Sequence, residues 1–111
     1  GLGVFNDHTL EGFLLGNLIT VEKITEYEIL LIYVNSQKRK LGYATKLLEN
    51  IQKNLKKKNL KKIFLEVAIN NYQAIELYKK NKFRKNGTRK NYYLMDNNKI
   101  DAFLFEKIID E

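Results

Sequence analysis

The sequence VNSQKRKLGYATKLL, residues Val34–Leu48, leads from an apolar segment through a basic turn into a second apolar pattern. Gly42 allows the backbone to approach a ligand closely. The unpaired N–H groups of a first helical turn attract an anion, and Arg39 and Lys40 add positive charge beside them. The stretch therefore predicts either a cradle for a pyrophosphate or a plain helix-capping turn.

The segments around this turn predict an α/β fold. Glu26–Val34 is rich in β-branched, aromatic and leucine residues, and its apolar second half predicts a central strand covered on both faces. Apolar residues recur at spacings of three and four from Leu41 to about Lys58, which predicts an amphipathic helix. A short buried strand, Lys62–Val67, and a second helix, Tyr72–Lys80, follow. Strand, helix, strand and helix in this order imply a parallel pair with a crossover.

The two ends of the chain predict further strands. Gly12–Ile19 reads as a strand, and the polar stretch Thr20–Thr25 reads as the turn to the next one. Arg89–Met95 and Ile100–Ile109 read as two strands around turn residues at 96–98. The 111 residues contain no repeat or linker, and this length suits one compact domain. We therefore expect one unit over residues 1–111, with antiparallel strands at one end of a mixed sheet and a hairpin at the other.

The composition argues against several kinds of site. Cysteine is absent, which excludes disulfides, thiolate metal sites and a cysteine nucleophile. His8 is the single histidine, so no zinc site is expected. The apolar run Ile29–Val34 is too short to span a membrane, and no signal-peptide pattern is visible. We expect a cytoplasmic protein without a membrane partner, although the start at Gly1 leaves room for a preceding targeting segment.

A net charge of +7 predicts attraction to polyanions, such as nucleic acid, an anionic membrane or a phosphorylated cofactor. Lysines suit the negative pole at the end of a helix, so a solvated face is the simpler interpretation of a lysine cluster there. The charge alone does not choose among these partners. Six lysines lie around the end of the first predicted helix: Lys53, Lys56, Lys57, Lys58, Lys61 and Lys62.

Three motifs resemble the GNAT superfamily of acetyltransferases. Residues 39–44 fit R-x-x-G-x-A between a strand and a helix, which resembles the acetyl-CoA motif Q/R-x-x-G-x-G/A. Leu65–Phe83, LEVAINNYQAIELYKKNKF, is similar to the segment L-E-V-x-x-x-N-x-x-A-x-x-L-Y-x-x-x-G-F of the ribosomal-protein-alanine N-acetyltransferase (RimI-like) branch. Arg89–Tyr93, RKNYY, and the strand IDAFLFEK resemble the same branch. Lys82 departs from the pattern, because most relatives carry glycine there.

The resemblance implies the GNAT fold, a mixed central sheet flanked by helices, whose first strand and two helices are expected to be missing from residues 1–111. It implies an enzyme that moves acetyl from acetyl-CoA directly to an amine without a metal. The branch implies the N-terminal amine of a protein as acceptor, with association with the ribosome as a further expectation and no specific nucleic-acid site. A lysine side chain or small amine is the alternative acceptor. A basic RNA-binding or ribosome-binding module with a vestigial acetyl-CoA site is the alternative from another class.

The resemblance also implies roles for individual residues. Backbone groups of a splayed strand pair with the pantetheine arm, and the basic turn binds the phosphates. Asn71 contacts the cofactor, although capping the next helix is an equally good use. Tyr92 and Tyr93 line the peptide entrance, or are ordinary hairpin tyrosines. The implied cofactor-binding set is Ile32, Tyr33, Val34, Arg39, Lys40, Leu41, Gly42, Tyr43, Ala44, Thr45 and Asn71.

Glu66 and Tyr78 are the catalytic residues that the resemblance implies. A carboxylate at the end of a buried strand is suited to accept a proton from the acceptor ammonium near neutral pH, and an ion pair of Glu66 with Lys61 or Lys62 is the alternative. The Tyr78 hydroxyl would protonate the departing thiolate, or would belong to a core aromatic. We expect both side chains to face one cleft. Positions on opposite faces of the sheet would instead favour Glu28 as the base.

Overall fold

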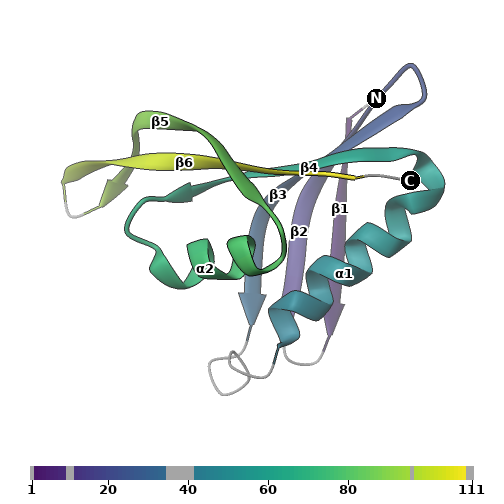
Figure 1. Cartoon of the computed structure of the whole chain (residues 1–111), viewed down its shortest axis with the longest axis horizontal. Coiled ribbons are helices and arrows are strands. Elements are labelled where there is room, and N and C mark those ends of the chain that lie inside the picture. The colour runs from purple at the N-terminus through teal and green to yellow at the C-terminus, as the bar shows by residue number, and fades with distance from the viewer. Residues whose placement is uncertain (1, 10–11, 35–41, 96, 110–111) are drawn as a thin grey trace.

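A computed structural model of the chain describes residues 2–9, 12–34, 42–95 and 97–109, with the backbone alone for 2–9 and 93–95. Its main feature is a six-stranded sheet in the order β1-β2-β3-β4-β6-β5 (Figure 1). The neighbours β3 and β4 are parallel, and all other neighbours are antiparallel. The strands are β1 (Leu2–Thr9), β2 (Gly12–Val21), β3 (Ile24–Val34), β4 (Leu60–Ala68), β5 (Arg84–Met95) and β6 (Asn98–Ile108).

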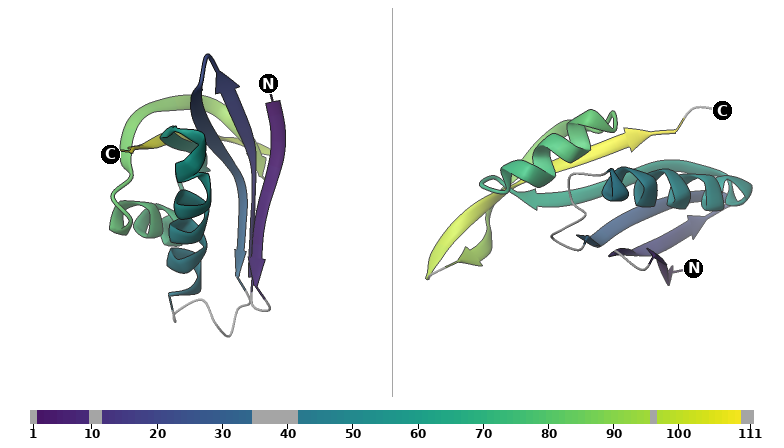
Figure 2. Two further views of the ribbon diagram at one scale, coloured as in Figure 1. Left: turned by 90° about the vertical axis from the view of Figure 1, so that its right-hand side faces the viewer. Right: turned by 90° about the horizontal axis from the view of Figure 1, so that it is seen from below.

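Two helices cover one face of this sheet. Helix α1 (Tyr43–Leu55) ends in a short 3-10 turn, η2 (Lys56–Lys58), and α2 (Tyr72–Lys80) follows β4. Their apolar stripes enter the same hydrophobic cluster, so both helices pack on the same side. Figure 2 shows α1 and α2 together on one side of β1, β2 and β3. None of the described helices is both long and apolar enough to cross a membrane.

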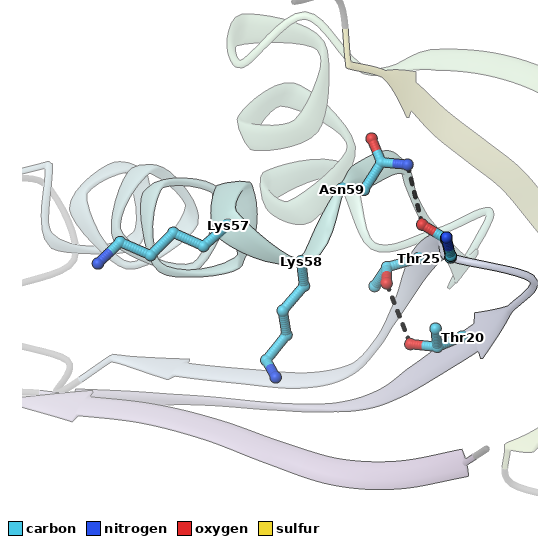
Figure 3. A pocket seen from close by; sticks show the side chains of 6 residues that line it. Thr20, Thr25, Lys57, Lys58 and Asn59 are labelled. Atoms are coloured by element: carbon cyan, nitrogen blue, oxygen red, sulfur yellow. Dashed lines mark hydrogen bonds between the residues drawn. The ribbon is translucent and has the colours of Figure 1, made fainter.

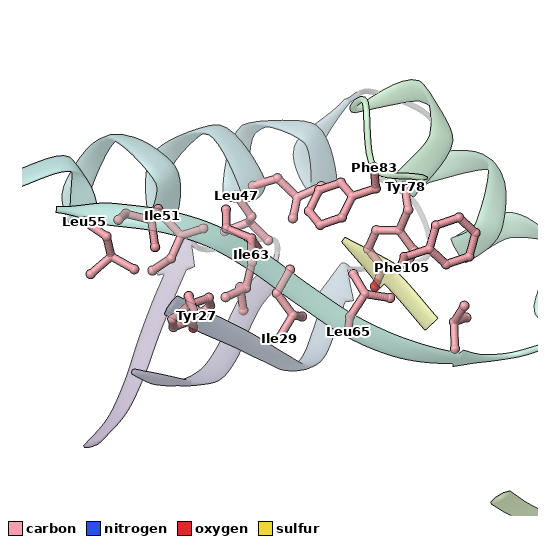
Figure 4. Close-up of a cluster of buried hydrophobic side chains, with 14 of the residues drawn as sticks. Tyr27, Ile29, Leu47, Ile51, Leu55, Ile63, Leu65, Tyr78, Phe83 and Phe105 are labelled. Carbon is pink, nitrogen blue, oxygen red and sulfur yellow. The ribbon is translucent and has the colours of Figure 1, made fainter. Parts of the chain in front are cut away.

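The core lies between the helices and this covered face. Along β4 the side chains of Ile63, Leu65 and Val67 are buried, as the period of two in a strand requires when one face is covered. They meet buried side chains from both helices and from β3 and β6 (Figure 4). The labelled members of this cluster are Tyr27, Ile29, Leu47, Ile51, Leu55, Ile63, Leu65, Tyr78, Phe83 and Phe105.

No helix among the described residues covers the opposite face, which we call the open face. Apolar side chains are exposed on it, including Leu31 and Tyr33, each with 47% of its surface accessible. The prediction that the second half of Glu26–Val34 is covered on both faces is therefore wrong for the described structure. The apolar composition of β3 has a different explanation, because a packed strand and an apolar open surface leave the same pattern in a sequence.

The predicted architecture is confirmed in its main points. The mixed sheet has a parallel pair at its centre, antiparallel strands at one end and the β5–β6 hairpin at the other. Helix α2 has the predicted bounds, whereas α1 ends at Leu55 rather than near Lys58. The turn between β2 and β3 is shorter than Thr20–Thr25, since the strands continue to Val21 and from Ile24. Its two central residues both have positive φ angles, which is typical of a tight hairpin turn.

Two strand segments were not predicted from the sequence. Strand β1 pairs with β2 along its whole length, from Leu2 with Ile19 to Thr9 with Gly12. Strand β5 begins at Arg84 and forms the edge of the sheet, where charged residues are favoured because they discourage pairing with other chains. Only the first half of β1 is apolar and residues 84–88 of β5 are polar, so pairing within the sheet rather than local propensity determines both segments.

Candidate active site

The parallel strands β3 and β4 separate halfway along their length. Their ladder runs from Thr25 with Leu60 to Glu28 with Phe64. Beyond this point the described residues of the two strands form no ladder, although β3 continues to Val34 and β4 to Ala68. Figure 1 shows the end of β3 pointing away from the end of β4, with α2 beside the opening. We call this opening the splay.

A β-bulge in β3 lies at the start of the splay. Leu15 pairs with Leu31 and Gly16 with Ile29, so Leu30 is an extra residue in β3. The bulge shifts the strand's alternation, because buried residues are odd-numbered up to Ile29, whereas Val34 is buried after it. Gly16 is needed here, since a Cβ atom would overlap the Glu28 carbonyl oxygen and the Tyr27 ring.

The start of α1 lies near the end of β3, at the same end of the splay (Figure 1). Gly42 occupies the N-cap position with φ of 78°, a left-handed conformation that favours glycine, and provides no side-chain cap. A Cβ atom added at Gly42 would meet no atom of the described residues within 4 Å. The first turn also carries no acidic residue, so no side chain of this turn neutralises the positive pole of the helix. The predicted turn residues Arg39, Lys40 and Leu41 lie outside the described residues.

Asn81 connects the two helices next to this helix start. Its amide nitrogen donates to the Thr45 hydroxyl at 3.2 Å and to the Leu77 carbonyl at 2.9 Å. Asn81 is also the C-cap of α2, so one side chain joins the end of α2 to the first turn of α1. Asn81 could not be identified from the sequence, because its contact with Thr45 spans 36 positions and follows no local pattern.

Glu66 lies on the open face of β4. Its strand neighbours Leu65 and Val67 are buried against the helices, so the intervening carboxylate points to the other side. It pairs with Arg89 of β5, whose Nη1 atom lies 3.2 Å from Oε1 and 3.4 Å from Oε2. The Arg89 guanidinium also lies over the ring of Tyr92, with its carbon 4.0 Å from the ring centroid. Arg89 thus contacts both the candidate base, Glu66, and Tyr92, one of the two residues expected to line the peptide entrance.

Tyr78 lies on the covered face, opposite Glu66. Its ring packs against Phe83 and Phe105, with centroid distances of 5.6 and 6.3 Å. Phe105 is the register partner of Leu65, whereas Leu104 is the partner of Glu66, and adjacent residues point to opposite faces. The prediction that Glu66 and Tyr78 face one cleft is therefore wrong in that form.

Replacing Glu66 by Glu28 as the base does not restore the predicted pairing. Glu28 pairs in register with Phe64, two residues before Glu66, so both carboxylates lie on the open face. The Asn17 amide donates to Glu28 at 3.5 Å. Whichever carboxylate acts as base, it lies on the face of the sheet opposite the one that carries Tyr78.

The remaining predicted residues have mixed outcomes. Asn71 caps α2, because its side-chain oxygen accepts a hydrogen bond from the Ala74 N–H at 3.3 Å. In the β3 segment Ile32–Val34, Tyr33 stacks on Phe13 on the open face, with ring centroids 5.6 Å apart. The backbone of Tyr93 pairs with Ile100, and its side chain lies outside the described residues.

The lysine cluster is at the other end of β3. Lys57 and Lys58 line a shallow pocket with Thr20, Thr25 and Asn59 (Figure 3), together with Lys23. The two threonine hydroxyls share a hydrogen bond of 3.0 Å, and the Asn59 amide donates to a backbone carbonyl at 2.8 Å. The side chains of Lys57 and Lys58 extend in different directions. This arrangement fits a solvated basic face better than a built anion site.

Known proteins share this fold and sequence. The model of the Acetyltransferase (GNAT) family matches residues 2–83. An N-alpha-acetyltransferase of Saccharolobus solfataricus is 42% identical over 79 residues, which are 70% of this chain and 41% of that protein.

Solved structures agree with this match. Arabidopsis thaliana NAA60 in complex with a bisubstrate analogue has a TM-score of 0.82 at 26% identity, covering 91% of this chain and 66% of that one. The ribosomal-protein-S18-alanine N-acetyltransferase from Escherichia coli has a TM-score of 0.79 at 25% identity, covering 97% and 70%. The chain spans between 33% and 41% of the length of the curated relatives it matches. With the family match covering most of the chain and the fold agreeing, this chain is a member of the GNAT acetyltransferase family.

Proposed function

We propose that this protein is an N-alpha-acetyltransferase that moves acetyl from acetyl-CoA to the N-terminal amine of a protein. The observation that carries the proposal is the splay, which ends beside the uncapped start of α1 and has the Glu66 carboxylate on its open-face side. Sequence relatives named N-alpha-acetyltransferase support it, as do related structures bound to acetyl-CoA or to an analogue that joins coenzyme A to a peptide.

The chain has features that fit a pantetheine arm and a pyrophosphate. The backbone edge of Ile32–Val34 on the β4 side lies beyond the end of the ladder, where an extended amide chain could pair with it. The open space at Gly42 and the N–H groups of Tyr43, Ala44 and Thr45 suit an anion at the positive helix pole. Arg39, Lys40 and Leu41 would complete this cradle, and Asn71, at the opposite end of α2 from Asn81, would contact another part of the cofactor. When bound, acetyl-CoA supplies an acetyl group activated as a thioester.

The protein's own residues would supply the proton transfers. Glu66 would accept a proton from the acceptor ammonium, directly or through a water, which makes the amine nucleophilic. Glu28 is the second candidate for this role. Tyr78 would donate its hydroxyl proton to the departing thiolate sulfur. Because Glu66 and Tyr78 lie on opposite faces, this scheme requires the thioester to sit within the splay, with the acceptor arriving from the open face.

The acceptor would then lie on the open face beside Tyr92 and Tyr93. Tyr92 has 42% of its surface exposed there. A half-exposed aromatic ring with a polar tip suits the edge of a peptide-binding surface. Transfer directly to the amine needs no covalent enzyme intermediate, which agrees with a sequence that has no cysteine nucleophile.

Incubation of the full chain with acetyl-CoA and peptides tests this function. One set should have free N-terminal amines, and a matched set should have blocked N-termini and an internal lysine. We expect acetyl on the free N-terminal amines alone, read by mass spectrometry. Acetylation of the blocked set would identify a lysine acetyltransferase instead. No acetyl transfer, together with thermal stabilisation by RNA and none by acetyl-CoA, would indicate a binding module.

A further inference from the structure

Arg89 occupies a place that none of the predicted catalytic roles uses. Its guanidinium has the Glu66 carboxylate on one side and the Tyr92 ring on another. A single nitrogen, Nη1, lies within 3.4 Å of both carboxylate oxygens. The carboxylate is thus held in one orientation by a group that is itself held against an aromatic face.

An irregularity in the backbone of β5 determines the position of this arginine. Arg89 pairs in register with Ala102, and the ladder then shifts before Tyr93 pairs with Ile100. Asn91 has a φ of 56° within this irregular stretch, and its N–H donates to the Asp101 carboxylate at 2.9 Å. The irregular stretch places Arg89 and Tyr92 where the guanidinium reaches the ring, which a regular strand would not do, since residues three apart point to opposite faces.

The path from Arg89 to Glu66 crosses the strand between them. Strand β6 separates β4 from β5, and its residue Ala102 is the register partner of both Ala68 and Arg89. Two alanines on the open face leave room for the long arginine side chain to reach along the surface toward Glu66. Ala102 is fully buried although it lies on this face, as expected beneath a covering side chain.

We propose that Arg89 is a positioning residue, which fixes the Glu66 carboxylate for proton acceptance and connects it to the acceptor surface through Tyr92. The proposal rests on the acetyltransferase function above. Stability is not its main effect, because the Arg89 side chain is 56% exposed and ion pairs this open contribute little to folding. Lysine would not replace arginine fully, because an ammonium lacks the flat face that stacks on tyrosine.

A double-mutant cycle on the full chain tests the role. Variants Arg89→Ala, Arg89→Lys and Glu66→Gln, and the double variant Arg89→Ala with Glu66→Gln, would be compared in kcat and KM for an N-terminal peptide and in acetyl-CoA affinity. Arg84→Ala is the matched control, because it removes the same charge from the far end of β5. Thermal unfolding of each variant separates loss of fold from loss of rate.

We expect Arg89→Ala to lower kcat by roughly tenfold to 10²-fold, the range for a small misplacement of a catalytic group, with acetyl-CoA affinity unchanged. Arg89→Lys should keep part of the rate, and Arg84→Ala should stay within about twofold of the wild type, as expected far from the site. In the Glu66→Gln background, Arg89→Ala should add almost nothing, because the group it positions is already gone.

Two outcomes would overturn the role while leaving the proposed function intact. One is wild-type kcat for Arg89→Ala in an active enzyme. The other is a full additional loss when Arg89→Ala is combined with Glu66→Gln, which would mean that Arg89 acts independently of that carboxylate. A folded wild-type protein without any peptide acetylation would overturn the proposed function itself, and the positioning role with it.

Discussion

From Thr25 to Glu28, β3 pairs with β4 and contributes buried side chains to the core. From Ile29 to Val34 the same strand forms no ladder with β4 and carries exposed apolar side chains on the open face, although Ile29 and Val34 themselves are buried. A β-bulge at Leu30 lies near the start of the second half. One strand therefore pairs with β4 at one end, whereas at the other end its β4-side backbone edge could pair with a ligand. Stability and chemistry can therefore be tested separately.

The largest effect should come from removing the candidate base at the edge of the splay. Glu66→Gln should lower turnover by roughly 10²-fold to 10⁴-fold, the usual range for loss of a general base. Acetyl-CoA affinity should stay at the wild-type value, because the carboxylate lies on the acceptor side. Steady-state kinetics and calorimetry measure the two quantities. Raising the pH should recover part of the rate, since more acceptor amine is then already neutral.

Glu28→Gln is the comparison that sharpens this result. Glu28 shares the open face with Glu66 but lies in the paired half of β3. If Glu28→Gln loses the rate while Glu66→Gln keeps it, Glu28 is the base and Glu66 is not. Tyr78→Phe should lower turnover without weakening acetyl-CoA binding, because the leaving sulfur needs its proton only as the bond breaks.

A charge placed at the start of α1 should abolish cofactor binding. Gly42→Glu introduces a negative side chain beside the expected phosphates and a strained positive φ, so acetyl-CoA affinity should fall by roughly 10²-fold or more. Asn50→Glu makes a similar charge change at an exposed position farther along α1 and serves as the control. If calorimetry gives equal affinities for Gly42→Glu and the wild type, the phosphates do not bind at this helix start.

Truncations in the two halves should differ in their effect on stability. Ile63 pairs with Tyr27 in the paired half and is 1% exposed, so Ile63→Ala should lower the free energy of unfolding by about 2 to 5 kcal/mol. Tyr33 lies in the splayed half and is half exposed, so Tyr33→Ala should cost about 1 kcal/mol or less. Denaturant titration measures both. A larger loss for Tyr33→Ala would mean that the open face of the splayed half also stabilises the fold.

The smallest effect should come from the turn after α2. Lys82 has a φ of 69°, the left-handed conformation that glycine favours at a helix end, and the Phe83 N–H closes the turn on the Tyr78 carbonyl at 2.9 Å. Lys82→Gly should therefore raise the free energy of unfolding by about 1 kcal/mol. This turn supports Tyr78, so the variant should leave the site intact. A destabilised Lys82→Gly variant would contradict this account.

The gain in the free energy of unfolding from Lys82→Gly should depend on pH. Burial, and secondly the charge of Lys82, hold the pKa of Lys107 below its ordinary value. The folded protein therefore bears the cost of charging Lys107 at neutral pH, and this cost disappears as the pH rises above the lowered pKa. The part of the Lys82→Gly gain that comes from repulsion should be largest at neutral pH and should shrink in alkaline solution.

The sequence was sufficient to predict those elements that a local pattern of apolar and capping residues determines. Helix α2 combines an apolar stripe with the Asn71 cap, and its predicted bounds match those observed. The alternation of Leu65, Glu66 and Val67 could also have corrected the prediction that Glu66 faces the same cleft as Tyr78. It places Glu66 on the face away from the helices, and therefore away from Tyr78.

Other features require the assembled sheet. The contact of Arg89 with Glu66 crosses β6 and joins residues 23 positions apart, so no local pattern indicates it. The splay depends on the Leu30 bulge and on the point where one ladder stops, neither of which follows from the composition of β3. Strand β1 depends on its pairing with β2. Such features depend on neighbours that are distant in the chain.

Amide hydrogen exchange with and without acetyl-CoA tests the central claim most directly, because it reports on the two halves of β3 in one experiment. The account predicts slower exchange on addition of acetyl-CoA at Ile32–Val34 and at Tyr43–Thr45, where the backbone would meet the cofactor. Exchange at Thr25–Glu28 and at Leu60–Phe64 should not change, since these amides belong to the paired ladder. Protection confined to the paired half, or none at saturating acetyl-CoA, would contradict the placement of the cofactor in the splay.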